Sequence, residues 1–453
     1  MNLLKKLSHT SYGSDRHTLL KLFRTLIRPI LDYGCSVYTY APDSRLRRLN
    51  TIQNTAVRIS TGAFRTTPTV SLLNDASECP LDIRRQYIST STYLGIKSNP
   101  DFNLKLEYII PIHSLSVKFQ SFLQQIEENI IKIHHLLVNP IPPWQSFNPI
   151  IDLSLTEFNK NHTNSIILKR HFLLLLDKYE EFSHIYTDGS KTQQFTGCAI
   201  IHGDVSIPIA LPSLCTILTA ELYAIKSAIS YSLDFSLNNV IIFTDSLSAL
   251  LSIKNYRSKY SHPISLEIIE LLQLFQNNTP ILCWIPSHSQ IQGNELADKT
   301  AKQAHLHLPL ANIPIPLSDL KLHSKRLMHE VFQSSWSQVP SSNKLKSIKN
   351  TTSLWKTSEQ HQRKSEVLLT RLRTGHSLLT HQFIFLKQPP PLCPECNNIP
   401  LNIAHLLIDC PSYQNERSRH LSSNQLQVLL SDNPSRTDEV IKFLISTKLD
   451  KKI

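Results

Sequence analysis

The sequence predicts an α/β protein with a mixed five-stranded sheet and flanking helices. From residue 182, three short β-rich runs follow one another, separated by polar turns, and helical and strand-like runs alternate after them. Before and after this region, apolar residues recur mainly at helical spacing. We therefore expect a helical segment, then the sheet domain, then a helical region and a small C-terminal module.

The elements of the sheet domain are expected within residues 182–306. Three antiparallel strands are predicted at HIYTD, TGCAIIHGD and VSIPIAL. TAELYAIKSAISYSL then has the apolar spacing of a helix, and NNVIIFTDS has the composition of a buried strand. The remaining predicted elements are the helices LSALLSIKNY and PISLEIIELLQLF, the strand ILCWIP and the closing helix GNELADKTAKQAHL.

The regions on either side divide where the composition changes. Residues 1–98 are predicted to be mainly helices with Arg and Lys opposite their apolar faces. Residues 99–181 are a connecting region, in which a Pro cluster at residues 139–150 marks a boundary. After the sheet domain we expect a basic helical linker at residues 307–380 and a Cys- and His-containing segment at residues 381–430. A polar tail is expected at residues 431–453.

Composition favours a folded, soluble protein. Of the 453 residues, 41% are apolar and 18% are charged, which excludes disorder over most of the chain. No apolar run is long enough to cross a bilayer, and MNLLKKLSHTS lacks the apolar segment of a secretory signal. We therefore expect an intracellular protein without a membrane partner; the sequence does not distinguish nucleus from cytoplasm.

The net charge of +12 is unevenly distributed along the chain. Residues 1–98 hold 14 Lys or Arg against 6 Asp or Glu, and residues 307–453 hold 19 against 11, so each flank carries +8. The ranges 99–181 and 182–306 each hold 7 basic residues against 9 acidic ones, or −2. Basic flanks suit a polyanion such as nucleic acid, since each neutralised phosphate releases counterions. The alternative is that these residues only keep helices soluble.

Eight cysteines are present, and five of them are isolated in apolar or mixed surroundings, as buried small side chains are. Cys393, Cys396, His405 and Cys410 instead form the pattern C-x2-C-x8-H-x4-C, which is able to supply one tetrahedral Zn²⁺ site. Four protein ligands leave no open position for catalysis, so the role of such a site is structural or in nucleic-acid binding. The alternative is that the four residues bind no metal.

Four carboxylates occupy unusual places in the sheet domain. Asp188 follows the strand HIYT and opens DGSK, where a turn Asp is the alternative to a catalytic one. Glu221 lies on or beside the apolar stripe of its helix, where ionisation is costly unless it has a partner or reaches water. Asp245 ends a buried strand, a usual ligand-binding place in open α/β sheets, or it helps to cap the next helix. Asp298, with Glu295 one turn before it, lies near the start of the last helix, where the helix dipole also favours acids.

Taken together, the four acids indicate a metal site. A single sheet edge can gather Asp188, Glu221, Asp245 and Asp298, and like charges so close repel unless divalent cations hold them ionised. Mg²⁺ prefers oxygen ligands, and two ions about 3.5–4 Å apart stabilise the attacking and leaving oxygens in phosphodiester cleavage. His288, between the last strand and the last helix, is placed to move protons or to help the product leave.

These motifs resemble those of a known family. YTDGS, TAELYAI, FTDS and WIPSHSQIQGNELAD are similar to the motifs of ribonuclease H domains, specifically those of Jockey-type non-LTR retrotransposons. The resemblance implies a ribonuclease H-like fold and endonucleolytic hydrolysis of the RNA strand of RNA–DNA hybrids by two Mg²⁺ ions, with Mn²⁺ as an alternative. It also implies that Asp188, Glu221, Asp245 and Asp298 are the metal ligands and that His288 is an auxiliary catalytic residue.

The likeness extends beyond the nuclease motifs. LIRPILDYGCSVY, within residues 1–98, is similar to the segment that follows the reverse transcriptase palm in these elements, and CPECNNIPLNIAHLLIDCP resembles their terminal zinc-binding segment. No YxDD or FADD sequence occurs, so the polymerase metal site is missing and a reverse transcriptase would act in trans. The sequence thus predicts a truncated retroelement protein.

Two departures from the family leave other interpretations open. Gln290 stands where the family commonly has Gly, two residues after His288, and loss of that Gly stiffens or displaces the loop. No strongly basic insertion occurs between Asp245 and His262, so hybrid affinity would depend on the basic flanks. One rival is therefore a catalytically impaired relic that only binds nucleic acid; another is a partner-binding zinc module on a structural scaffold.

Overall fold

The computed structural model describes residues 1–39, 41–99, 133–134, 144, 147–158, 163–258, 261–275, 278–306, 309–397 and 399–453. Most of the predicted connecting region before residue 147, including much of its Pro cluster, lies outside the described residues. The chain divides into two compact units. Among the described residues, unit 1 comprises 1–90 and 325–453, and unit 2 comprises 91–99 and those from 133 to 324. No helix in this described part of the chain combines the length and apolar character needed to span a membrane.

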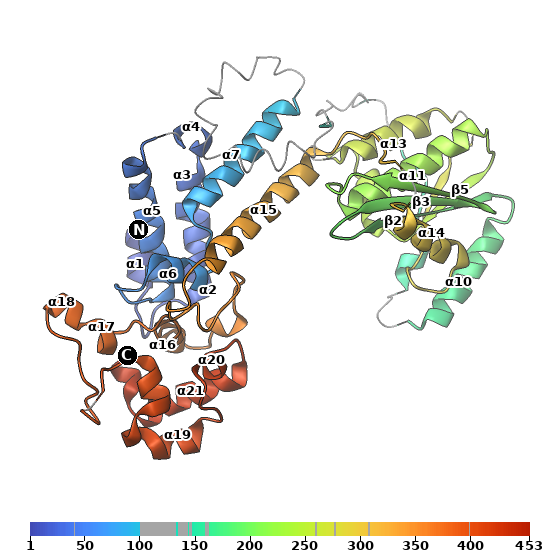
Figure 1. Ribbon diagram of the computed structural model, residues 1–453. Helices are drawn as coiled ribbons and strands as arrows, with labels where there is room; N and C mark the ends of the chain where they lie inside the picture. Colours follow the sequence, from blue (N-terminus) through green and yellow to red (C-terminus); the bar gives the residue numbers. More distant parts are fainter. Residues whose placement is uncertain are drawn as a thin grey trace. The chain divides into compact units, whose positions relative to one another are not determined.

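Unit 2 is built around a mixed sheet with flanking helices (Figure 1). The sheet has six strands in the order β1-β6-β5-β2-β3-β4. The strands are β1 (Ile151–Asp152), β2 (Ser183–Lys191), β3 (Thr196–His202), β4 (Val205–Leu211), β5 (Val240–Thr244) and β6 (Ile281–Trp284). The first long strands β2, β3 and β4 form an antiparallel meander, whereas β5 runs parallel to β2 and to β6. Every residue of β5 is buried, which explains its uninterrupted apolar run. The predicted mixed sheet is therefore confirmed.

The sheet has one strand more than the five predicted. β1 is a two-residue strand that pairs parallel with β6, through Ile151 and Leu282. It lies in the range that was expected to be a connecting region. Two residues cannot show the alternation by which strands are recognised in a sequence, so this pairing is a tertiary contact without a local signal.

Helices cover both faces of the sheet. They are α10 (Ser165–Lys178), α11 (Ile217–Asp234), α12 (Leu247–Lys254), α13 (Pro263–Gln273) and α14 (Gln292–Gln303), with the short 3-10 helix η2 (Ser154–Glu157). Gly197 and Cys198 are neighbours on β3 and therefore face opposite sides. A side chain at Gly197 would meet Ala301 of α14, whereas Cys198 packs in a cluster that includes Ala224 of α11. α11 and α14 thus lie on opposite faces of the sheet.

Unit 1 is built mainly of helices. The N-terminal elements are α1 (Asn2–Leu7), α2 (Arg16–Leu22), η1 (Phe23–Ile27), α3 (Arg28–Asp32), α4 (Cys35–Tyr38), α5 (Asp43–Thr61), α6 (Thr69–Asp75) and α7 (Leu81–Lys97). The C-terminal elements are α15 (Leu317–Ser337), η3 (Lys356–Ser358), α16 (Arg363–Thr374), α17 (Leu378–His381), α18 (Phe383–Leu386), η4 (His405–Asp409), η5 (Pro411–Tyr413), α19 (Gln414–His420), α20 (Leu426–Leu429), α21 (Pro434–Ser446) and η6 (Leu449–Lys451). Helices α7 and α15 each continue into residues of unit 2.

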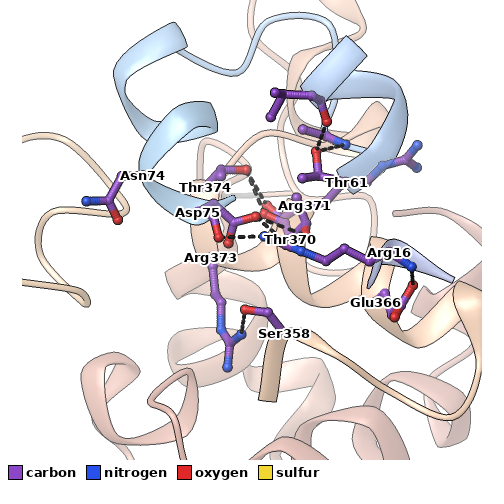
Figure 2. A network of polar contacts seen from close by, with 12 residues as sticks. Arg16, Thr61, Asn74, Asp75, Ser358, Glu366, Thr370, Arg371, Arg373 and Thr374 are labelled. Carbon is purple, nitrogen blue, oxygen red and sulfur yellow. Dashed lines mark hydrogen bonds and ion pairs between the residues drawn. The ribbon is translucent and has the colours of Figure 1, made fainter. Parts of the chain in front are cut away.

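A buried polar network joins the N-terminal and C-terminal parts of unit 1 (Figure 2). The guanidinium of Arg16 on α2 donates a hydrogen bond of 2.7 Å to the carboxylate of Asp75 at the end of α6. The backbone N–H of Arg16 donates a hydrogen bond of the same length to the carboxylate of Glu366 on α16. All three residues are at most 2% exposed. Because a buried charge that loses its partner costs about 3–5 kcal/mol, these distant ranges of the sequence fold as one unit.

The range predicted as a polar tail, residues 431–453, is a packed part of unit 1. It contains α21, whose Val440, Phe443 and Leu444 are fully buried. These side chains share a core cluster with Leu368 and Leu372 of α16. The expectation of a tail is therefore wrong. The i, i+3, i+4 spacing of the three apolar residues is a helical signal that the surrounding polar residues obscure.

Candidate active site

The pairing of two parallel strands brings two of the predicted acids together. Thr187 of β2 pairs with Thr244 of β5, so the next residues along the two strands, Asp188 and Asp245, are neighbours. β2 does not end at a turn in DGSK; it continues to Lys191 and stays paired with β3. Asp188 is therefore a strand residue, 6% exposed, and its interpretation as a turn Asp is wrong.

Glu221 reaches the same place from α11. Gly189 allows a close approach, since a Cβ at this position would lie 2.8 Å from the backbone nitrogen of Glu221. The helix therefore packs directly on β2. The Glu221 side chain is buried, with the residue 7% exposed, and does not reach water as an edge Glu would. Its Oε2 has no hydrogen-bond partner.

The start of α11 is held by a residue that sequence reasoning missed. Asp319 on α15 accepts hydrogen bonds from the Thr216 N–H at 2.7 Å and from the Thr219 hydroxyl at 2.6 Å. A carboxylate at a helix N-terminus satisfies unpaired N–H groups and suits the helix dipole. The contact thus fixes the helix that carries Glu221. No local signal marks Asp319, because it lies 103 positions from Thr216.

Asp188, Glu221 and Asp245 form one cluster, in which one oxygen from each residue lies within 4.8 Å of the others. Burial, followed by the charges of Asp245 and Asp298, raises the pKa of Asp188 to about 8. Burial, followed by the charges of Asp188 and Asp245, also raises the pKa of Glu221. The cluster therefore resists full ionisation, and a bound cation is what lets such carboxylates stay charged together.

Asp245 is held by residues of the neighbouring elements. It does not cap the following helix, because Ser246 is the N-cap of α12 and its hydroxyl accepts from the Ala249 N–H. The carboxylate of Asp245 instead accepts a hydrogen bond from Asn294 Nδ2 at 3.2 Å, and its carbonyl accepts one from Trp284 Nε1 at 3.1 Å. Asn294 is 5% exposed. Sequence reasoning missed Asn294 too, although it stands inside the GNELAD motif.

Asp298 lies near the three-carboxylate cluster but is not a member of it. It stands in the second turn of α14 with its side chain 31% exposed. Lys302, four residues later, donates to Asp298 Oδ2 at 2.6 Å. The charge of Asp298 nevertheless contributes to the raised pKa of Asp188. The structure thus brings three of the four predicted acids together and pairs the fourth with a lysine.

His288 and Gln290 are exposed residues of the loop between β6 and α14. Both have positive φ angles, +55° at His288 and +57° at Gln290. A residue other than glycine in this left-handed region costs about 1–2 kcal/mol. Gln290 therefore adopts a conformation that glycine reaches without this cost. This agrees with the departure noted from the sequence at the same position.

The predicted Cys and His ligands also form a cluster, in unit 1. Sγ of Cys393 lies 3.8 Å from Sγ of Cys410, and Sγ of Cys396 lies 3.4 Å from Nε2 of His405. All four possible ligand atoms lie within 4.8 Å of one another, and only Cys396 is not fully buried. Cys393 and Cys396 share a tight turn, in which the Asn397 N–H donates to the Cys393 carbonyl. His405 is the first residue of the π-helical turn η4, and Cys410 directly follows its last residue.

We expect Asp188→Asn to stabilise the metal-free protein. The pKa of Asp188 is raised from 3.8 to about 8 in the folded state. The folded protein therefore holds a proton that the unfolded chain releases, and stability is lost as the pH rises from about 4 to 8. A neutral Asn removes this penalty, which is worth roughly 2–4 kcal/mol at pH 8. Urea unfolding without divalent cations, at about pH 5 and pH 8, measures the free-energy difference.

The matched control is Asp204→Asn, an exposed acid of the turn between β3 and β4. It should change the free energy of unfolding little at either pH. A gain for Asp188→Asn that does not grow with pH, or an equal gain for the control, contradicts the expectation.

Comparison with protein families agrees with this geometry. The RNase H family model matches residues 180–305, a range that includes β2 to β6, α11 and α14. None of the curated proteins matches the chain. Among solved structures, the protease-reverse transcriptase of prototype foamy virus is 23% identical over 28% of this chain and 21% of that chain, with a TM-score of 0.24. On the family match, residues 180–305 of this chain form an RNase H domain.

Proposed function

We propose that the RNase H domain hydrolyses the RNA strand of RNA–DNA hybrids as an endonuclease that uses two divalent cations. The observation that carries the proposal is the cluster of Asp188, Glu221 and Asp245 beside the paired strands β2 and β5. Three carboxylates held this close destabilise the protein without a metal. A metal-dependent reaction explains why they stand together, and the family match supplies the substrate class.

The donor set of the cluster suits Mg²⁺. Every donor is a carboxylate oxygen, the ligand type that hard cations prefer. The buried Oε2 of Glu221 lacks a hydrogen-bond partner, and a cation would supply its missing interaction. Asp188, Glu221 and Asp245 would hold the ions, joined by Asp298 once it leaves Lys302. Bound there, Mg²⁺, or Mn²⁺ in its place, supplies Lewis-acid stabilisation of the attacking and leaving oxygens.

Other side chains of the domain would act around this centre. His288 would accept or return a proton as the product leaves, because an imidazole side chain can act as a general acid or base. Asn294 would keep the Asp245 carboxylate oriented through its 3.2 Å hydrogen bond. The hybrid would be bound through its backbone shape, phosphates and 2′-hydroxyls rather than through base edges.

For the whole chain we propose a retroelement protein of the Jockey type that acts together with a reverse transcriptase. The sequence likeness on both sides of the nuclease motifs supports this origin. The +8 charge of each flank supports nucleic acid as the partner.

The Cys and His cluster would bind one structural Zn²⁺. Tetrahedral Zn–S bonds of about 2.3 Å place two sulfurs about 3.8 Å apart. The Sγ atoms of Cys393 and Cys410 are separated by 3.8 Å. Buried Nδ1 of His405 has no hydrogen-bond partner, so the ring is held through its other nitrogen, which faces Cys396.

One observation favours a second candidate function, a relic that binds nucleic acid without turnover. Gln290 has the φ of +57° at a position where the family commonly has Gly. A costly conformation beside His288 would slow the reaction even with an intact carboxylate cluster.

Cleavage of a labelled RNA–DNA hybrid in Mg²⁺ tests the main proposal. We expect the unmodified chain to cleave the RNA strand and Asp245→Asn to lower the rate by about 10³-fold, because the variant loses one of the metal-binding carboxylates. The exposed acid substitution Asp204→Asn is the control and should keep the full rate. Equal cleavage rates for the unmodified chain and Asp245→Asn, or cleavage by neither, would contradict the enzymatic proposal.

We expect Gln290→Gly to raise the cleavage rate about fivefold, which corresponds to about 1 kcal/mol of relieved backbone strain. The rate is measured at saturating hybrid and Mg²⁺. Gln194→Gly, at an exposed turn position without a positive φ, is the matched control and should not raise the rate. If neither glycine variant is faster, the loop does not limit turnover.

Metal analysis of the full chain tests the zinc site. We expect about one Zn²⁺ per chain, and its loss together with a lower unfolding temperature in Cys393→Ser, because three ligands no longer close the tetrahedron. Cys79→Ser, which changes a cysteine outside the cluster, should retain the zinc. The proposed zinc site is contradicted if the unmodified chain holds no stoichiometric zinc, or if Cys393→Ser holds as much zinc as the unmodified chain.

A further inference from the structure

Unit 1 exposes an apolar helix that the proposed cleavage does not use. α18 consists of the four residues FIFL, none of which is buried. Ile384, Phe385 and Leu386 are 49%, 44% and 54% exposed. Adjacent apolar side chains that stay exposed in a folded protein are typical of a binding site. The chemistry around α18 decides which kind of ligand fits it.

The loop that follows α5 packs on the aromatic ring of α18. The guanidinium carbon of Arg65 lies 4.7 Å from the centre of the Phe385 ring. Phe64 contacts the same ring edge-on, with the ring centres 6.0 Å apart. Phe385 is therefore held in place on one side by a cation and an aromatic ring, while 44% of its surface remains exposed. Such a ring is a rigid platform for stacking.

Lys344 lies close to the same region, near two stacked histidine rings. Thr66 Oγ1 lies 2.9 Å from His376 Nδ1, and His376 stacks on His381 with ring centres 3.9 Å apart. Burial, followed by the charge of nearby Lys344, lowers the pKa of His381. Lys344 also packs over Gly375, where a Cβ would lie 2.7 Å from its side chain. The α18 surface, as used below, consists of Phe64, Arg65, Lys344, His381, Phe385 and Lys387.

The segments that build the α18 surface contain no acidic residue. Asp and Glu are absent from residues 44–74, 331–358 and 367–394, which together hold 12 Arg or Lys. Arg65, Lys344 and Lys387 are exposed. A ligand with many negative charges is complementary to this surface, whereas a surface of mixed charge is not. Charge and stacking together match one class of ligand, an anionic chain with flat, unpaired rings.

We infer that the α18 surface binds single-stranded nucleic acid, with Phe385 stacking on a base and Arg65, Lys344 and Lys387 contacting backbone phosphates. An unpaired strand fits better than a duplex, whose bases stack on one another and leave no free face for Phe385. RNA and DNA share this chemistry. The inference does not rest on hybrid cleavage, since none of the carboxylates of the RNase H domain takes part.

Fluorescence anisotropy with the full chain in Mg²⁺-free buffer tests the inference. The probes are labelled oligonucleotides of about 12 residues, as single-stranded RNA, single-stranded DNA and a DNA duplex. We expect Phe385→Ala to weaken single-strand binding about tenfold and Phe385→Trp to retain it. The double variant Arg65→Met, Lys387→Met should lower the slope of log affinity against log salt by about 1.4, or 0.7 per phosphate contact. Lys442→Met, an exposed cation of α21, is the matched control and should change neither quantity.

The outcomes separate binding from a role in folding. Tighter binding of single-stranded RNA than DNA, or the reverse, supports the inference and identifies the strand. Equal binding of duplex and single strands that Phe385→Ala does not weaken overturns it, and so does a chain that binds no oligonucleotide at low salt. Equal losses in Phe385→Ala and Phe385→Trp, with lowered unfolding temperatures, also overturn it, because they assign Phe385 a structural role. A chain that binds single strands but cleaves no hybrid would refute only the proposed function.

Discussion

The mutual repulsion of three close carboxylates, two of them buried, is the constraint on which the RNase H domain depends. Asp188, Glu221 and Asp245 each prefer to be apart or in water, yet the fold holds them within 4.8 Å of one another. Parallel pairing of β2 with β5 sets two of them side by side, and Gly189 lets α11 bring the third. Asp319 then anchors the start of α11 from a distant helix. Backbone geometry and packing thus oppose the repulsion, which keeps the site arranged before any cation binds.

Unit 1 depends on a different kind of buried charge, one that is paired. Arg16 contacts both Asp75 and Glu366, so helices from the two ends of the chain share one core. Most residues of the two basic flanks of the sequence therefore belong to the same body. The Cys and His cluster and the α18 surface belong to this body as well. Unit 1 thereby combines a basic composition with a proposed zinc-stabilised fold.

Local patterns predicted most elements of the sheet domain, and the physical reason for each failure is specific. The strand β5 and the helix α11 were predicted because their burial produces a clear apolar pattern. β1 was missed because two residues show no period, and α21 was taken for a tail because polar residues surround its apolar positions. Asp188 lies beside Asp245, and its strand continues through DGSK, where composition indicates a turn. Asn294 and Asp319 were missed because their roles depend on partners far along the chain.

By itself the sequence determined the order of the elements, the acidic and Cys/His candidate ligands and the RNase H motifs, because residue chemistry and periodicity are local properties. It also identified Gln290 as a departure, and the backbone angle of +57° explains why a side chain is costly there. Only the tertiary structure decided which acids meet, that Asp298 pairs with Lys302, and that the two flanks form one unit. It alone left α18 exposed among cations. These features depend on burial and on contacts between residues distant in sequence, which no local pattern encodes.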